Sequence, residues 1–303
     1  MKIAMMGSGG VGGYYGARLQ QAGEEVTFIA RGAHAEAMRR DGLRIRSQAG
    51  DALLKPVRAI EDPAQAGVQD LVIVAVKLWD SESAARALAP MAGPQTAVVS
   101  LQNGVDKDEV LARQVGEEKV LGGVTHIFAV LSSPGVIQHT GKLARVSIGE
   151  LGGGRTERLE RIAAALQNAG IEVIVSDDIR RVTWEKFVFL TALSGLTALT
   201  RKPVGEVRAH PATLALLLDA LRETAQVARA EGVRLDQGLP DQQLAAIDGL
   251  NPAMLSSMAQ DLLRGKRLEL EWLSGAVVRR AQKLGVPVPV HRAIHAALVL
   301  HAG

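Results

Sequence analysis

The chain contains no cysteine, which excludes disulfides, thiolate metal sites and cysteine nucleophiles. Aromatic residues make up only 3% of its 303 residues, so the core must be built mostly from Ala, Val, Leu and Ile. No apolar run reaches the roughly 18 residues that a membrane span requires. The apolar stretch 3–6 is too short for the core of a signal peptide. These absences predict a cytoplasmic protein that is not bound to a membrane.

The chain also has only a small excess of positive over negative charge. The formal net charge is +3, and no basic tract occurs, so we expect no nucleic-acid partner, although a small positive surplus is compatible with anionic ligands. The seven histidines form no metal-binding constellation, and His291, His295 and His301 are interpreted as a face of a terminal helix. We therefore predict no metal. With 47% hydrophobic residues, a chain of this length favours two globular domains.

The first 30 residues have the pattern of a strand, a glycine-rich turn, a helix and a second strand. Gly7, Gly9 and Gly12 satisfy the spacing G-x-G-x-x-G directly after a short apolar run. In such a turn the first glycine permits the reversal, the second lets backbone approach a pyrophosphate, and the third allows close packing of helix and strand. The alternative is a glycine-rich turn without a ligand. The predicted cofactor-binding segment also includes Ser8, Gly10 and Val11.

Arg31 follows the second apolar strand, 26–30. An acidic residue at this place of a dinucleotide-binding fold would favour NAD, whereas an arginine accepts the 2′-phosphate of NADP. The sequence therefore favours NADP(H) as cofactor. The competing interpretation is a solvated arginine at the edge of the sheet.

Alternating strand and helix patterns continue through the first half of the chain. Apolar strands at 71–76, 96–100 and 171–175 are separated by helical patterns at 81–89 and 155–170, which predicts a parallel, doubly wound sheet of Rossmann type. Lys77 and Asn103 follow two of these strands at the edge where ligands bind. Between 119 and 149 we expect hairpins with turns at 134–135 and 139–141, in which His126 and His139 are structural rather than catalytic.

The period changes after residue 176. Helical patterns cover 182–199, 206–231, 253–264, 268–283 and 290–301, with Asp177 or Asp178 near the first cap. The predicted organisation is an N-terminal Rossmann-type α/β domain, 1–176, followed by an all-α domain, 177–303. The apolar helices of the second domain could support a homodimer.

Several blocks along the chain resemble the ketopantoate reductase family, or 2-dehydropantoate 2-reductases. These are GSGGVGG, Arg31, the lysine ending VAVK, QNG at 102–104, WEKF, and SSMAQDLLRGKRLELEWLSG at 256–275. The resemblance covers essentially the whole chain. It implies a two-domain NADPH enzyme that reduces ketopantoate to pantoate, a step of pantothenate biosynthesis.

The resemblance also implies roles for individual residues. Lys186 would be the general acid, with Asn103 beside it, and Ser257 and Glu269 would match the family's serine and glutamate at the substrate. Arg31 and Lys77 would grip the 2′-phosphate side of the cofactor. Glu271 competes with Glu269, but two residues apart on a helix they point about 200° apart. The twelve-residue offset from Ser257 favours Glu269.

Two positions depart from the family pattern. The family usually has asparagines four and eight residues after the catalytic lysine, where this chain has Leu190 and Ser194. Leu190 removes a polar contact from the substrate and supplies an apolar wall. One alternative is therefore a paralogue that reduces a more apolar 2-keto acid, similar to D-mandelate dehydrogenases or other D-2-hydroxyacid dehydrogenases. A second alternative is an NADP-binding sensor without turnover, which the retained Lys186 and Glu269 disfavour.

Overall fold

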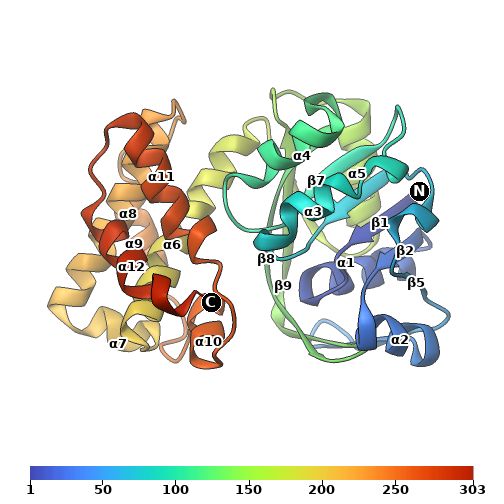
Figure 1. The fold of residues 1–303 in the computed structure, drawn as a ribbon, viewed down its shortest axis with the longest axis horizontal. Helices are drawn as coiled ribbons and strands as arrows, with labels where there is room; N and C mark the ends of the chain where they lie inside the picture. The colour runs from blue at the N-terminus through green and yellow to red at the C-terminus, as the bar shows by residue number, and fades with distance from the viewer. Residues whose placement is uncertain (303) are drawn as a thin grey trace. The chain divides into compact units, whose positions relative to one another are not determined.

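The computed structural model describes residues 1–302, and its chain divides into two compact units (Figure 1). Unit 1 comprises 1–103 and 107–179, and unit 2 comprises 104–106 and 180–303. The chain therefore enters unit 2 briefly after the Asn103 turn and returns to unit 1 before its final crossing. Each unit is described by itself below.

Unit 1 is built on one sheet. Over the described residues its order is β4-β3-β9-β8-β7-β6-β1-β2-β5, with β10 paired to β9. The strands from β8 to β5 in this order pair in parallel. The strands are β1 (Lys2–Met6), β2 (Glu25–Ile29), β3 (Leu43–Ser47), β4 (Ala52–Leu54), β5 (Arg58–Ile60), β6 (Leu71–Val74), β7 (Ala97–Ser100), β8 (Val120–Ser133), β9 (Val136–Glu150) and β10 (Glu172–Val175).

Helices cover both faces of this sheet, which confirms the predicted doubly wound α/β fold. Ile3 and Met5 of β1 pack in the same core as α1 (Gly10–Gln21) and α5 (Glu157–Asn168). Ala4 and Met6, which alternate with them, pack instead with α3 (Ser81–Arg86) and α4 (Lys107–Val115). Because both faces are covered, the central strands β1, β6 and β7 are apolar at nearly every position. The remaining helix of this unit is α2 (Gly32–Asp41), with short 3₁₀ turns at Pro63–Ala66, Leu78–Asp80, Ala89–Met91 and Glu117–Lys119.

A single long hairpin, β8–β9, replaces the several hairpins expected over 119–149. Its turn lies at Pro134 and Gly135, where Gly135 has φ +77°. The second expected turn, at 139–141, is wrong, because these residues lie within β9. Gly141 has φ +79°, and the pairing of β8 with β9 is irregular between Ile127 and Ala129, so the glycine accompanies a bulge rather than a reversal.

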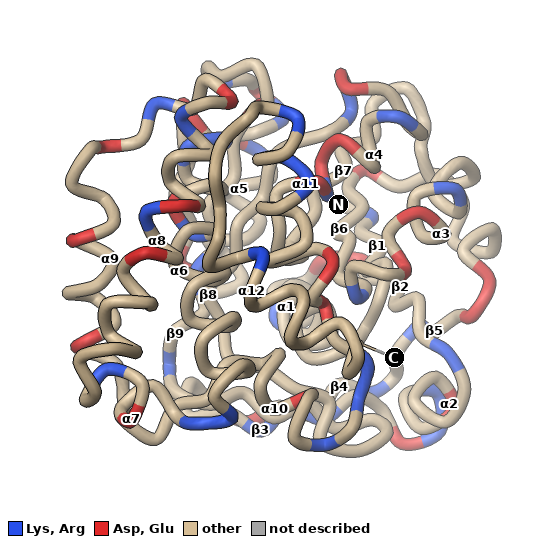
Figure 2. The backbone as a smooth tube through the Cα atoms, turned by 60° about the vertical axis from the view of Figure 1, so that its left-hand side comes forward, with Lys and Arg blue, Asp and Glu red and all other residues tan. Residues whose placement is uncertain are grey.

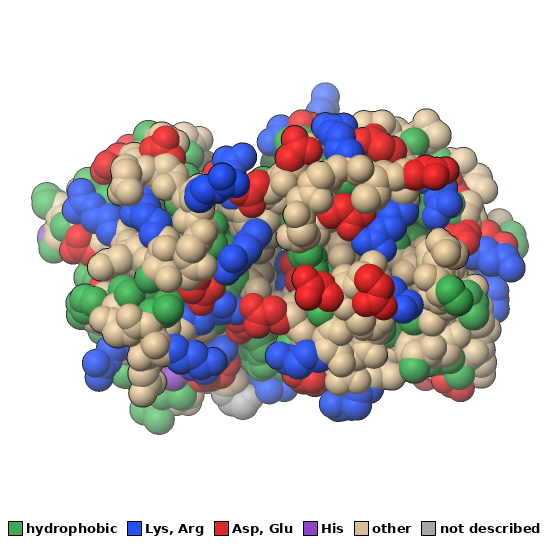
Figure 3. All heavy atoms as spheres, turned by 90° about the horizontal axis from the view of Figure 1, so that it is seen from above, with side chains coloured by type: hydrophobic (Ala, Val, Ile, Leu, Met, Phe, Trp, Pro, Cys, Tyr) green, Lys and Arg blue, Asp and Glu red, His purple; other side chains and the backbone are tan. Residues whose placement is uncertain are grey.

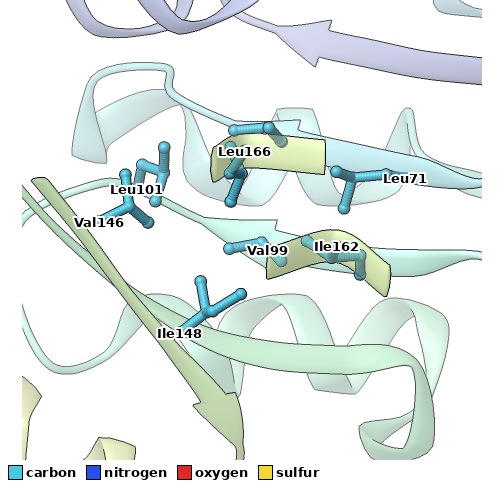
Figure 4. Close-up of a pocket in the computed structure, with 8 residues that line it drawn as sticks. Leu71, Val99, Leu101, Val146, Ile148, Ile162 and Leu166 are labelled. Atoms are coloured by element: carbon cyan, nitrogen blue, oxygen red, sulfur yellow. The ribbon is translucent and has the colours of Figure 1, made fainter. Parts of the chain in front are cut away.

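A small apolar cavity lies between the sheet and α5. Figure 4 shows side chains from the sheet and from α5 turned toward it, and all of its lining is aliphatic. The lining residues are Leu71, Ile73, Val99, Leu101, Val146, Ile148, Ile162 and Leu166. A site with no polar atom to fix a ligand's orientation is a packing gap in the core rather than a candidate for chemistry.

Unit 2 is helical. Its longest helices are α6 (Ile179–Thr200), which starts at the end of unit 1, and α8 (Pro211–Ala230). The helix expected over 206–231 is wrong in its extent, because it divides at Pro211, which has no N–H to donate. The other helices are α7 (Val204–Ala209), α9 (Leu239–Asp248), α10 (Ser257–Leu263), α11 (Ser274–Leu284) and α12 (Pro289–Leu298), with 3₁₀ turns at Leu270–Trp272 and Val299–His301.

The core of unit 2 contains a buried polar network. His291 is fully buried, and its imidazole contacts the hydroxyls of Thr224 at 2.8 Å and Ser274 at 3.3 Å. Burial lowers the pKa of His291 to about 4, against the opposing effect of its bond to the Ala220 carbonyl. Glu223 accepts the N–H groups of Val290 and His291 at the start of α12. His291 and His295 lie four residues apart on α12, as expected, whereas His301 lies in the 3₁₀ turn beyond that helix. His291 is a neutral core residue.

Charges of both signs are interspersed along the backbone and on the face drawn in space-filling form (Figures 2 and 3). Among the described residues, no helix combines the length and apolar character needed to cross a membrane. The same part of the chain holds no cluster of three or more His, Asp or Glu side chains arranged to bind a metal ion.

Candidate functional site

The glycine-rich turn joins β1 to α1, and most of its glycines are required by the protein's own packing. Gly7 has φ +94°, and a Cβ there would lie 2.8 Å from Val76. A Cβ on Gly12 would overlap the carbonyl oxygen of Gly7, and one on Gly10 would overlap the carbonyl of Ala129 in β8. These glycines bring the first turn of α1 against two strands, a contact that a side chain at any of the three positions would prevent.

Gly9 is the exception. Its φ is −69°, which any residue can adopt, and a Cβ built on it meets no atom of the other described residues within 4 Å, apart from its own neighbours in the chain and helix. Neither backbone strain nor packing explains a glycine at this position. Gly9 caps the N-terminus of α1, where unpaired N–H groups and the helix dipole favour an anion. Open space at the cap, within a turn that is otherwise closely packed, fits the backbone approach of a dinucleotide's pyrophosphate.

The neighbours of Gly9 in the turn serve to hold it. The hydroxyl of Ser8 donates to the carbonyl of Ile29 at the end of β2 at 3.1 Å, and Ser8 is 2% exposed. Val11 packs against the unit 1 core. Any contact of Ser8 with a cofactor would therefore use backbone atoms.

The predicted Arg31 and Lys77 lie at the same edge of the sheet as the turn. β1 pairs with β2 on one side and β6 on the other, so the carboxyl ends of the three parallel strands are adjacent. Arg31 is exposed at the N-cap of α2, after β2. Lys77 is exposed after β6, with its ammonium 5.5 Å from the centre of the Trp79 ring. Two cations thus flank the strand end that carries the glycine turn.

Gln102 supports this edge in a way that sequence reasoning missed. The residue is 6% exposed, and its amide donates to the Val76 carbonyl at 3.0 Å and to the Ser81 hydroxyl at 2.8 Å. It therefore joins the end of β7 to the segment that carries Lys77 and to the start of α3. Asn103, the predicted catalytic neighbour, is the next residue and is half-buried. The sequence places Gln102 in the QNG block at the end of a strand but gives no signal for these hydrogen bonds.

Lys186, Leu190 and Ser194 lie four residues apart on α6 in unit 2, and hence on one face of the helix. Lys186 and Leu190 are half-buried, and Leu190 packs against the helical core. Ser194 is fully buried, and its hydroxyl has no hydrogen-bond partner among the residues that the structure describes. Trp184 and Phe187 are both buried and pack edge to face, with their ring centroids 5.5 Å apart. This packing fixes the rotation of this part of the helix.

Glu269 and Ser257 come from the last block of unit 2. The helix assumed for 268–283 is wrong at its start, because Glu269 is the cap of the 3₁₀ turn Leu270–Trp272, and α11 begins only at Ser274. Glu269 is 8% exposed, whereas Glu271 bonds to His295 at 2.7 Å and to Arg279. The two carboxylates thus have different environments, as expected. The expected reason, an angle of about 200° between them on an α-helix, does not apply, because neither residue lies in an α-helix.

The adjacent serines also separate into two environments. Ser256 caps α10 through its hydroxyl, which accepts the Ala259 N–H at 3.1 Å. Ser257, the predicted substrate contact, is exposed at the first position of that helix.

Asp106 accounts for the short excursion of the chain into unit 2. The Arg280 guanidinium donates to Asp106 at 2.9 Å and to both carboxylate oxygens of Glu231 at 2.7 Å. It also lies 5.8 Å from the centre of the Trp184 ring. This arginine therefore connects the segment that follows Asn103 to the helix that carries Lys186.

Comparisons with known proteins agree with these observations. The family model described as "Ketopantoate reductase PanE/ApbA" matches residues 3–153, and the model of the C-terminal part of the same family matches residues 178–301. A 2-dehydropantoate 2-reductase of Archaeoglobus fulgidus is 35% identical, over 97% of this chain and 95% of its own. An uncharacterized oxidoreductase, YkpB of Bacillus subtilis, is 32% identical over 99% of both chains.

Solved structures show the same fold. A PanE/ApbA family ketopantoate reductase of Ralstonia eutropha superposes with a TM-score of 0.92 at 37% identity, covering 100% of this chain and 98% of its own. A D-mandelate dehydrogenase has a TM-score of 0.92 at 23% identity, over 100% and 98% of the two chains, a likeness of fold alone. With both parts of the family matched and several relatives above 30% identity, the chain is an oxidoreductase that belongs to the ketopantoate reductase PanE/ApbA family.

Proposed function

We propose that the protein reduces 2-dehydropantoate (ketopantoate) to pantoate with NADPH. The observation that carries this proposal is the open space at Gly9, in a turn where the neighbouring glycines are needed for packing. A relative that is 34% identical over 97% of this chain, from Halobacterium salinarum, is named 2-dehydropantoate 2-reductase, as is the Archaeoglobus fulgidus protein.

The cofactor is held by groups of unit 1. The N-terminus of α1 and the Gly9 backbone bind the pyrophosphate, and Arg31 and Lys77 bind the 2′-phosphate that distinguishes NADPH from NADH. Bound nicotinamide supplies the hydride. Arg31 suits this task because its planar guanidinium matches phosphate oxygens, and its exposure leaves it accessible to a ligand.

Lys186 provides the proton in this proposal. Negative charge develops on the keto oxygen as the carbonyl is reduced, and the ammonium Nζ stabilises that charge and then donates a proton. The packing of Trp184 and Phe187 holds the helix in one rotation, which limits the positions that Nζ can take. Asn103, Ser257 and Glu269 are proposed to orient the substrate and the lysine.

Leu190 favours a second candidate, the reduction of a more apolar 2-keto acid. The side chain lies one helical turn beyond Lys186 and is half-buried. Its apolar surface leaves a substrate hydroxyl near it without a hydrogen bond, at a cost of about 1–3 kcal/mol. The remaining proposed residues serve either substrate.

The first test concerns the glycine turn. Gly9→Ala places a methyl group in open space, so the free energy of unfolding should change by less than about 1 kcal/mol. The same methyl group obstructs the pyrophosphate, so the Kd for NADP⁺, measured by titration calorimetry, should rise at least about tenfold. Gly12→Ala is the matched control that should fail by unfolding, because its Cβ overlaps the Gly7 carbonyl. An unchanged Kd in Gly9→Ala would remove the main support for the cofactor site.

Cofactor selectivity is tested with Arg31→Ala. Loss of a charged hydrogen bond to phosphate should raise the Kd for NADP⁺ by roughly tenfold or more and leave the Kd for NAD⁺ within about twofold. Arg39→Ala is the control, since Arg39 lies on the same helix and pairs with Glu61 at 3.2 Å. Equal weakening of both cofactors would contradict selection of NADPH by Arg31.

The proton donor is tested with Lys186→Ala, for which kcat should fall by about 10²–10⁴-fold while the Kd for NADP⁺ is unchanged. Lys202→Ala is the control. Lys202 is an exposed lysine just beyond the end of α6 that pairs with Glu206, so this variant should retain wild-type turnover. Steady-state oxidation of NADPH measures both variants. Turnover within a few-fold of wild type in Lys186→Ala would assign the proton to another group.

Substrate choice is tested by comparing kcat/KM on ketopantoate with a panel of branched and aromatic 2-keto acids. Ketopantoate should be preferred, and Leu190→Asn should raise its kcat/KM by roughly five- to 100-fold through the regained hydrogen bond. Preference for an apolar substrate would favour the second candidate. Tight NADPH binding without oxidation by any keto acid would instead indicate a sensor.

A further inference from the structure

His34 connects three segments of unit 1 that lie far apart in the sequence. It sits in the first turn of α2, three residues after Arg31, and is half-buried. Its Nε2 lies 2.8 Å from the carbonyl oxygen of Ser8 in the glycine turn, and its Nδ1 accepts the N–H of Gly135 at 2.9 Å, at the tip of the β8–β9 hairpin.

These two contacts require one form of the imidazole. Because Nδ1 accepts a hydrogen bond from Gly135, the ring proton must be on Nε2, from which it is donated to Ser8. A second proton on Nδ1 would face the N–H of Gly135, and that hydrogen bond would be lost. The neutral Nε2–H tautomer alone satisfies both neighbours.

The contact with Ser8 acts directly on Gly9. The Ser8 carbonyl and the Gly9 N–H belong to one planar trans peptide, so they point in opposite directions. A hydrogen bond that fixes the carbonyl therefore also fixes the direction of the Gly9 N–H. Ser8 is also held from a second side, because its hydroxyl donates to the carbonyl of Ile29 at the end of β2.

We propose that His34 is a positioning residue of the dinucleotide site: its neutral imidazole orients the Ser8–Gly9 peptide for the pyrophosphate and couples this turn to the helix that begins after Arg31. The inference rests on the proposed NADPH function. It adds a consequence that the family motif does not contain, a loss of cofactor affinity when this histidine is protonated.

The sign of the pH dependence follows from the environment of the ring. Burial lowers the pKa of His34 below its ordinary value, and the bond to the Ser8 carbonyl opposes this effect. The Nε2–H donates to Ser8 in both protonation states, whereas a second proton on Nδ1 breaks the Gly135 contact that anchors the ring. The ring is therefore anchored at neutral pH and is released as the pH falls through the lowered pKa. The glycine turn and the hairpin tip carry no titratable side chain. The titratable side chains of α2, its N-cap and the strand β3 that follows it are Arg31, Glu36, Arg39, Arg40, Asp41, Arg44 and Arg46.

Two substitutions separate the contacts of His34. In His34→Gln the amide nitrogen reaches as far as Nε2 and can donate to Ser8, so the Kd for NADP⁺ at about pH 7.5 should stay within about twofold of wild type. In His34→Asn the shorter side chain can replace only Nδ1, so Kd should rise roughly three- to tenfold. His210→Asn is the control, because His210 also accepts a backbone N–H through Nδ1, from Ala212, but lies in unit 2.

The readout that a structural role alone would not change is the pH profile of binding. Titration calorimetry with NADP⁺ from about pH 7.5 to about pH 5.5 should show a rise in Kd for the wild type that exceeds the rise for His34→Gln by at least about threefold. The 2′-phosphate of the ligand also titrates near pH 6, but its contribution is common to both proteins. Thermal unfolding at each pH confirms that the variants are folded.

The outcomes separate the two proposals. If the wild type binds NADP⁺ but His34→Asn binds it equally well, or the pH profiles of wild type and His34→Gln coincide, the role of His34 is refuted and the cofactor site stands. If the wild type itself does not bind NADP⁺, the proposed function and this inference fail together.

Discussion

The close approach of α1 to its neighbouring strands is the constraint on which unit 1 depends. The helix starts directly after β1 and is pressed against β8, and this is sterically possible only because Gly7, Gly10 and Gly12 have no side chain. The contact directs the N-terminus of α1 to the carboxyl edge of the sheet. The strands that carry Arg31 and Lys77 end at the same edge, so one packing requirement also assembles the candidate phosphate-binding groups.

Unit 2 has a different requirement, the rotation of the long helix that carries the candidate residue Lys186. α6 is apolar on most faces, and its position is set by aromatic packing at Trp184 and Phe187 together with the guanidinium of Arg280. That arginine also holds Asp106, the residue through which the turn after Asn103 enters this unit. The buried hydroxyls of Thr224 and Ser274 and the neutral His291 satisfy one another in the core.

Prediction from sequence succeeded where a pattern repeats or where a residue type has one common use. The strands 71–76, 96–100 and 171–175 were expected because long apolar runs bounded by turn residues suit buried parallel strands, and β6, β7 and β10 confirm them. The helix containing Lys186 was expected from the helical pattern over 182–199, and α6 confirms it. Errors occurred at helix ends and turns, where a single proline or bulge decides the outcome, as at Pro211 and Gly141.

The sequence by itself determined the fold class, the glycine turn, the family resemblance and the departure at Leu190, because these depend on residue type and spacing along the chain. Only the tertiary structure decided which glycine faces open space, that Ser256 caps a helix while Ser257 is exposed, and that Gln102 and His34 hold the edge of the sheet. Each of these properties depends on atoms contributed by segments distant in sequence. A pattern along the chain describes a residue's neighbours in order, whereas its surroundings in space are set by packing.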